Sequence, residues 1–297
     1  MYSEVYSVTL AGLDACIVKV ETDAGDGLPS FEMSGCLAAQ VTEARERVRV
    51  AVKNSGIILR PQKIMVNISP ADIRKAGNGF DLPVAAGILA ADGIIKTDML
   101  ESSVIIGELS LDGSVNAVRG IINCVAKAAQ MGFKRCIVPS CNICEGEHIE
   151  GIEVLGVDSL KQLIGYFNGE SELIDAIDAK KSREHDVIHM KNETCPDFAD
   201  ITGQNICYMG IPGTGKTMMA KRISTIMLPL NESEKMELTR IYSAAGKLEG
   251  RSIIEERPVR CPNYNTTKAV MLGGGVVLSP GEITLADKGI LFLDEFN

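Results

Sequence analysis

The first stretch of the chain alternates apolar and polar residues in short runs. Between residues 4 and 35 these runs include Ile17, Val18 and Val20, and the turn-forming sequence Ala24-Gly25-Asp26-Gly27 interrupts them. Alternation with a period of two, bounded by glycine-rich turns, is typical of half-buried β-strands. We therefore expect the chain to begin with strands.

The apolar spacing changes after residue 40. Residues 41–53 place apolar side chains on one face at helical period, namely Val41, Ala44, Val48 and Val52. Charged side chains occupy most of the other positions. This pattern predicts an amphipathic helix.

Strands and helices then follow in mixed order. We expect strands at 63–68, 104–107 and 136–138, and helices at 81–91, 120–131 and 159–167. Such an order predicts one α/β or α+β domain, here residues 1–168. Residues 169–199 lose the apolar periodicity and fill with charge, which indicates a linker.

The remaining residues, 200–297, predict a second domain. The apolar run 206–209 predicts a buried strand that leads into Gly210, and residues 218–227 predict a helix. A chain of 297 residues with 45% hydrophobic content is large enough for two separate cores.

Residues 210–217 match the pattern of a phosphate-binding loop (P-loop, or Walker A). They read GIPGTGKT and satisfy G-x-x-x-x-G-K-[ST] between a predicted strand and a predicted helix. The glycines let backbone N–H groups converge on phosphate oxygens, and the positive end of the following helix points at the same anion. The predicted ATP-binding residues are Gly210, Ile211, Pro212, Gly213, Thr214, Gly215, Lys216 and Thr217.

Two of these side chains have specific roles in the expected chemistry. Lys216 would reach the β- and γ-phosphates, and the Thr217 hydroxyl would bind Mg²⁺. A second element agrees with this reading, because the apolar run 289–293 ends in Asp294 and Glu295. This order is typical of a Walker B strand, with Asp294 holding Mg²⁺ and Glu295 polarising the attacking water.

Composition narrows the remaining function classes. No apolar run approaches the roughly 20 residues of a membrane-spanning helix, and the N-terminus lacks a secretory signal. Nine scattered cysteines suit reduced thiols, so we expect a cytoplasmic protein without membrane contact. A net charge of −9 argues against a protein coated in basic surface for nucleic acid, although a local basic channel stays open.

Several stretches resemble the magnesium-chelatase-like AAA+ ATPases of the ComM/YifB group. The resemblance covers nearly the whole chain and includes GLPSFEMSG (27–35), VNISPADIRKAGNGFDLPVAAGILAADG (66–93), GELSLDGSVNAVRG (107–120), GIPGTGKTMMAKR (210–222), RPVRCP (257–262) and PGEITLADKGILFLDE (280–295). It implies a Lon-protease-like N-terminal domain followed by an AAA+ module. It also implies a homo-oligomeric ring and, from one relative, DNA remodelling by branch migration.

This chain departs from the family pattern in three places. Gln204 leads directly to Asn205 and Ile206, without the helix that the family has there. Asn263 and Tyr264 replace two histidines. The chain stops at Asn297, before the sensor, arginine-finger and lid regions of AAA+ proteins, so we expect it to bind ATP better than it hydrolyses it.

Three other groups of residues have patterns that are found at catalytic, metal-binding or DNA-binding sites. The turn 78–82 has Asp81 where Lon-type peptidases carry their serine, and residues 119–122 lack the lysine, so we expect no peptidase activity. Cys136, Cys141, Cys144 and His148 have a zinc-like spacing, but Cys136 lies in a predicted buried strand. Arg45, Arg49 and Lys53 form a cationic helical stripe that is either a solvated face or a contact for DNA.

The favoured function is ATP binding by part of a DNA-remodelling motor. One alternative is a metal-insertion subunit like that of magnesium chelatase, although such a motor is not expected to carry the Lon-like domain. A third reading is a non-functional or split-gene fragment.

Overall fold

The computed structural model describes residues 1–73, 75, 77–176, 206, 209, 215–248, 250–263, 265–274 and 278–294, of which 39, 40, 216, 217 and 221 are described by their backbone alone. The chain divides into two compact units. Among the described residues, the first unit comprises those of 1–176 and 250–252, and the second comprises those of 206–248 and 253–294. The predicted domain ranges 1–168 and 200–297 remain predictions.

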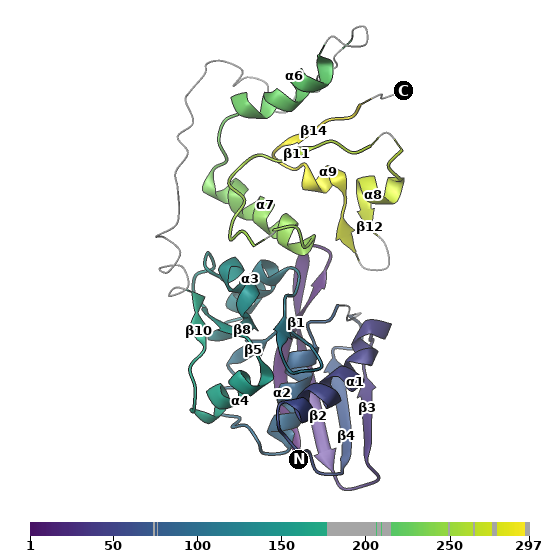
Figure 1. Ribbon diagram of the computed structural model, residues 1–297, viewed down its shortest axis with the longest axis vertical. Coiled ribbons are helices and arrows are strands. Elements are labelled where there is room, and N and C mark those ends of the chain that lie inside the picture. The colour runs from purple at the N-terminus through teal and green to yellow at the C-terminus, as the bar shows by residue number, and fades with distance from the viewer. Residues whose placement is uncertain are drawn as a thin grey trace. The chain divides into compact units, whose positions relative to one another are not determined.

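The first unit is a mixed α/β fold around an eight-stranded sheet (Figure 1). The strand order is β10-β9-β8-β5-β1-β2-β4-β3. The strands are β1 (Tyr2–Ala11), β2 (Asp14–Gly25), β3 (Ser30–Ser34), β4 (Lys63–Ser69), β5 (Ser103–Ile105), β8 (Arg135–Pro139), β9 (Glu153–Val157) and β10 (Ile174–Asp175). A separate small hairpin pairs β6 (Glu108–Leu109) with β7 (Val115–Asn116).

Parallel and antiparallel pairs are mixed in this sheet. Strand β1 pairs antiparallel with β2 over its whole length, and β2 also pairs antiparallel with β4. Strands β1, β5, β8 and β9 run parallel to one another. The strand expected at 104–107 is present as β5, which ends at Ile105.

Helices cover both faces of the sheet around two cores. One core joins the sheet to α1 (Ala39–Asn54), α2 (Asp81–Ala91) and α4 (Leu160–Asn168). The other joins it to α3 (Ile121–Gln130) and the 3-10 helix η1 (Ser140–Gly146). Along β8, Ile137 belongs to the first core while Cys136 and Val138 belong to the second, as alternation in a strand requires.

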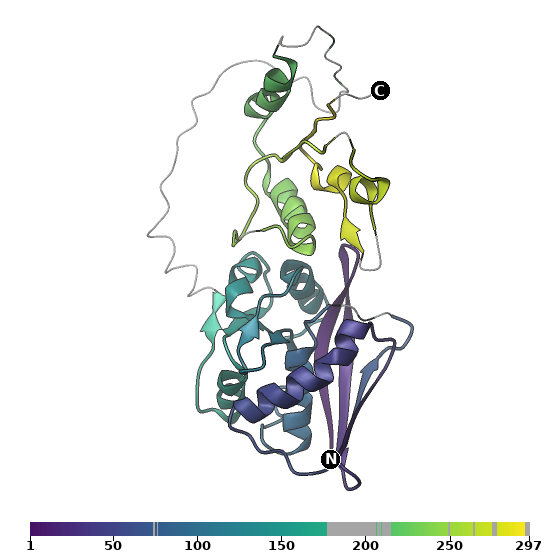
Figure 2. The same cartoon turned by 45° about the vertical axis from the view of Figure 1, so that its right-hand side comes forward.

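The long helix α1 confirms the predicted amphipathic pattern. Val41, Ala44, Val48 and Val52 are all buried, whereas Arg45, Arg49 and Lys53 are exposed. In Figure 2, α1 lies over the sheet on the same side as α2, with which it shares a core. The helices expected at 81–91, 120–131 and 159–167 are likewise confirmed to within a residue at each end.

The last two strands at one end of the sheet, β9 and β10, were not predicted. Strand β9 is buried on both faces, so its sequence does not alternate. Strand β10 pairs with β9 and extends the sheet beyond residue 168, into the range predicted as a linker. Residues 177–199 of that range lie outside the described residues.

The second unit consists of short elements. Its helices are α6 (Lys216–Arg222), η3 (Ile223–Ile226), α7 (Glu232–Ala244), α8 (Lys268–Leu272) and α9 (Glu282–Leu285). Its strands are β11 (Val259–Arg260), β12 (Gly273–Gly274), β13 (Ser279–Pro280) and β14 (Ile290–Leu291). Leu230, Leu238, Leu248 and Ile254 form a small core against Tyr242.

Three elements expected in this unit differ from their predicted ranges. The helix expected at 218–227 is α-helical only to Arg222, where the Thr225 hydroxyl donates to the Arg222 carbonyl at 2.7 Å and competes with helical bonding. Within the described residues, the strand expected at 289–293 pairs with β11 at Ile290 and Leu291. Ile206 and Met209, the described residues of the strand expected at 206–209, lie outside any strand.

Within the described residues, no helix is long and apolar enough to cross a membrane.

Candidate functional site

The helix that follows the predicted phosphate loop begins at Lys216. Gly215 precedes it with φ 82° and ψ 14°, a left-handed conformation that favours glycine. The Met219 N–H donates to the Gly215 carbonyl at 3.0 Å, which closes the first helical turn. Gly210, Ile211, Pro212, Gly213 and Thr214 lie outside the described residues, as do the side chains of Lys216 and Thr217.

The predicted Walker B strand pairs in parallel with β11. The Ile290 N–H donates to the Pro258 carbonyl and the Phe292 N–H to the Arg260 carbonyl, both at 2.8 Å. Asp294 follows this strand and is exposed, while Glu295 lies outside the described residues. The approach of Asp294 to Thr217 at a shared magnesium ion stays a prediction.

Pairs of charged residues hold β11 and β14 in place. Arg260 donates two hydrogen bonds of 2.7 Å to the carboxylate of Glu282 at the start of α9. These bonds lower the pKa of Glu282 below its ordinary value. Arg257, two residues before β11, donates to the backbone carbonyls of Leu228 and Lys288.

Helix α7 and these arginine contacts were missed in the sequence. The signal for α7 was present, because Asn231 and Glu234 form a capping box in which each side chain accepts the other's backbone N–H. Arg257 and Arg260 both stand in the stretch RPVRCP (257–262) that carries the family resemblance, but no local pattern indicates their partners, which are distant in sequence.

Asp81, the residue at the peptidase-like turn, serves an ion pair. It is fully buried at the start of α2, where Arg47 of α1 donates to both of its oxygens at 2.8 and 2.9 Å. The Leu109 N–H adds a third hydrogen bond at 3.2 Å. Burial raises the pKa of Asp81, and the hydrogen bonds from Arg47 act against that rise.

Residues 119–122 stand at the start of α3. Gly120 has φ 73°, and a Cβ there would collide with the Leu10 side chain. The buried Glu145 accepts the Ile122 N–H at 3.4 Å and the Asn142 side-chain amide at 2.7 Å. The helix end is thus bound by a carboxylate from η1.

The cysteines with zinc-like spacing differ in burial. Cys136 and Cys144 are buried while Cys141 is exposed, and burial raises the pKa of Cys136 to about 12. Among the residues that the structure describes, no group of three or more His, Cys, Asp or Glu is arranged to hold a metal ion.

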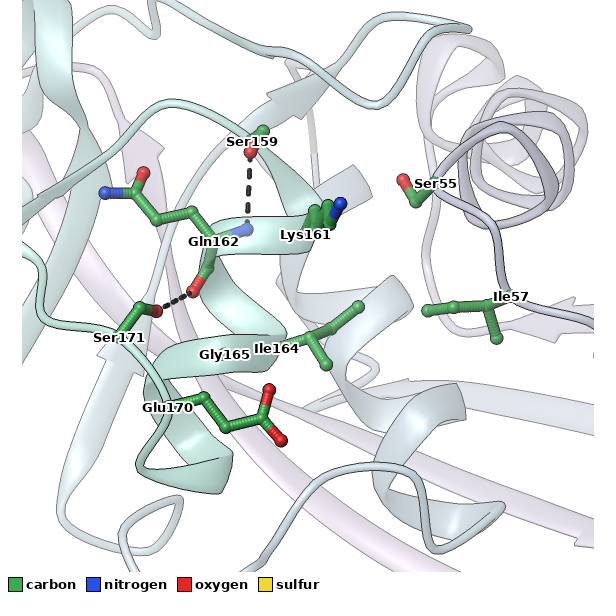
Figure 3. A pocket seen from close by; sticks show the side chains of 9 residues that line it. All are labelled: Ser55, Ile57, Ser159, Lys161, Gln162, Ile164, Gly165, Glu170 and Ser171. Carbon is green, nitrogen blue, oxygen red and sulfur yellow. Dashed lines mark hydrogen bonds between the residues drawn. The ribbon is translucent and has the colours of Figure 1, made fainter.

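A cavity of about 530 Å³ lies between the end of α1 and α4 in the first unit. Figure 3 shows Ile57 and Ile164 facing each other across it. Its serines are engaged locally: Ser55 donates to Ala51, Ser171 donates to Gln162, and Ser159 caps α4. These three hydroxyls are used within the fold, and we assign no ligand to this cavity.

Comparison with known families matches two segments of the chain. The model described as subunit ChlI of Mg-chelatase matches residues 20–142, and the model described as magnesium chelatase, subunit ChlI, matches residues 189–297.

Curated relatives match along most of the chain. The protein YifB of Escherichia coli is 34% identical over 302 residues, which is 99% of this chain. Competence protein ComM of Haemophilus influenzae is 31% identical over 306 residues, or 98% of this chain. The chain spans 59% of the length of each.

A more distant relative matches about half of the chain. DNA repair protein RadA of Halalkalibacterium halodurans is 32% identical over 149 residues, 50% of this chain and 32% of its own length. The two family models and the agreement with YifB and ComM over nearly all residues together place this chain in the magnesium-chelatase-like family that contains YifB and ComM.

Proposed function

We propose that residues 210–217 bind the phosphates of ATP, with Mg²⁺ held by Thr217 and Asp294. The observation that carries this proposal is the junction at Gly215, where a left-handed glycine leads directly into the helix that starts at Lys216. In a phosphate loop this junction aims the free N–H groups of the first turn at the anion.

The strand before Asp294 supports the same proposal. It runs parallel to its neighbour β11 and delivers an exposed carboxylate at its C-terminal end. Ligands of α/β proteins bind outside the carboxyl ends of parallel strands. Glu295, the next residue, is then the group proposed to polarise the attacking water.

Calorimetry with Mg²⁺ and ATP tests the site. The wild-type chain should bind, and Lys216→Ala should lose binding because the ammonium is the main side-chain charge opposite the terminal phosphates. Lys161→Ala, an exposed lysine of the first unit, is the matched control and should bind like wild type. Equal affinity of wild type and Lys216→Ala would remove the phosphate-loop assignment.

We further propose that the chain acts on DNA as part of an oligomeric, cytoplasmic motor, with a Lon-like first domain that is not a peptidase. The support comes from two similar proteins: the family member ComM is named for competence, and RadA, which matches about half of the chain, is named for DNA repair. Exposed Arg45, Arg49 and Lys53 on α1 supply a local cationic stripe despite the net charge of −9.

DNA binding is tested by fluorescence anisotropy at several salt concentrations. A triple variant with glutamine at 45, 49 and 53 should bind more weakly and with a smaller salt dependence, since each phosphate contact releases counterions. Unchanged binding would show that another surface contacts the DNA. No binding by the wild type would favour the second candidate function.

That second candidate is a metal-insertion ATPase subunit. The descriptions of both family models favour it, because each names magnesium chelatase. Matches to YifB and ComM that cover the first unit as well weigh toward the DNA role. ATP-dependent loading of Mg²⁺ into a porphyrin by a reconstituted partner complex would decide for the chelatase reading.

A further inference from the structure

A single guanidinium in the second unit connects three separate segments of the chain. The Arg257 side chain is 11% exposed. Its Nε donates to the Leu228 carbonyl and its Nη1 to the Lys288 carbonyl, both at 2.6 Å. Its Nη2 pairs with the Glu234 carboxylate at 3.2 Å.

The carbonyl of Lys288 lies at the entry to β14, where the backbone has little freedom. Lys288 has φ 52°, which is unusual for a residue with a side chain. A Cβ at the next residue, Gly289, would collide with the Pro258 carbonyl oxygen. The direction in which β14 leaves this corner, toward Asp294, is therefore determined here.

The carbonyl of Leu228 belongs to the chain that leaves the phosphate-loop helix. Helix α6 ends at Arg222 and continues through η3 to Ile226, so Leu228 follows almost directly. Glu234 is itself held, because its Oε2 also accepts the Asn231 N–H at 3.0 Å. The guanidinium thus binds partners with fixed positions on both sides.

We propose that Arg257 is a positioning residue for the nucleotide site, which sets the start of the Asp294 strand relative to the helix that carries Lys216 and Thr217. This inference rests on the proposed ATP site. The planar fork of an arginine can bind several acceptors in fixed directions, whereas a lysine ammonium is a compact charge on a flexible stem. Arg257→Lys keeps the charge and loses this geometry.

The test separates magnesium-dependent from magnesium-independent ATP binding in the full chain. ATP affinity is measured with Mg²⁺ and with EDTA for wild type, Arg257→Lys and Arg257→Gln, with the exposed Arg251→Gln as control. We expect the affinity gained from Mg²⁺ to fall by about tenfold in both Arg257 variants, as for other residues that orient metal ligands. Affinity in EDTA should change little, because the phosphate loop itself is intact.

Amide hydrogen exchange provides a second readout that needs no nucleotide. Residues 288–294 should exchange faster in both variants than in wild type, while α7 keeps its protection. Equal losses with Mg²⁺ and EDTA, together with lost protection throughout the second unit, would mean a merely structural role and overturn the inference. The inference would also be overturned if the wild type binds ATP and Mg²⁺ increases the affinity of the Arg257 variants as much as it does that of the wild type. A wild type that binds no ATP overturns the proposed function and this inference with it.

Discussion

Asp81 stands at a position that suggests a catalytic role, but in the fold it is buried and paired with Arg47. The resemblance drawn from the sequence places Asp81 at the position where Lon-type peptidases carry their serine. In the fold, both oxygens of Asp81 accept hydrogen bonds from Arg47. A buried carboxylate with a cationic partner stabilises the fold only while the partner remains, because the unpaired charge is costly in the interior.

Arg47→Ala should therefore lower the free energy of unfolding of the first unit by about 3 kcal/mol, the low end for breaking a buried pair because Arg47 is partly exposed. Arg45→Ala, on the exposed side of the same helix, should change it by less than about 1 kcal/mol. Chemical denaturation of the two variants checks the difference. Similar values for both would show that the pair is solvated.

Glu295→Gln separates binding from hydrolysis at the proposed ATP site. The amide cannot polarise water, so any hydrolysis should disappear while Mg²⁺-dependent ATP binding persists. Phosphate release and calorimetry on the same preparation provide the measurement. Loss of binding would indicate that Glu295 supports the fold and does not act on water.

At the scale of elements, apolar periodicity predicted the first unit well. Helix α1 was expected from the spacing of its buried residues, and the structure confirms it. The helix expected at 81–91 is also confirmed, although α2 is buried on all sides and has no polar face. Strand β9 was not predicted, because both of its faces are buried and its residues Val154, Leu155 and Val157 show no alternation of apolar and polar side chains.

The same method performed less well in the second unit. Strands β11 and β14 are two residues each, and their positions depend on Arg257, Arg260 and Glu282. Such contacts join residues far apart in the sequence, so no local pattern reveals them. The phosphate loop was recognisable because its chemistry requires fixed spacing, but its geometry at Gly210–Thr214 lies outside the described residues.

The contact between β11 and α9 predicts a pH dependence. Hydrogen bonds from Arg260 lower the pKa of Glu282 below 4.5, so the folded state holds this proton less tightly than the unfolded state does. The stability contributed above that value is lost as the pH falls through the lowered pKa. Calorimetric unfolding should show the second unit losing stability as the pH falls below the ordinary range of a glutamate and through the lowered pKa of Glu282.

Glu282→Gln should reduce that acid-side loss of stability. Part of it should persist, because the backbone N–H of Asn231 also lowers the pKa of Glu234. An identical pH profile in wild type and variant would exclude Glu282 as a source of the dependence.

For the whole molecule, family membership leads to a prediction about assembly. AAA+ ATPases place nucleotide between subunits, so Mg²⁺ and ATP should shift the chain to a larger species in size-exclusion chromatography with light scattering. Lys216→Ala should stay at the size of the nucleotide-free chain. A wild type whose size does not respond to nucleotide would argue against a ring formed by these residues alone.

The corner at Gly289 also limits how this sequence can change over time. The nearest of the atoms that exclude a Cβ there is the backbone oxygen of Pro258, which every amino acid at position 258 would carry, and two atoms of the proline ring lie somewhat farther away. Replacing the proline ring with a smaller side chain therefore makes no room. Many tight contacts in a protein can be relieved by a compensating substitution at a neighbouring residue. No side-chain substitution removes a backbone oxygen. Descendants of this sequence that keep the β11–β14 pairing must therefore keep glycine at 289.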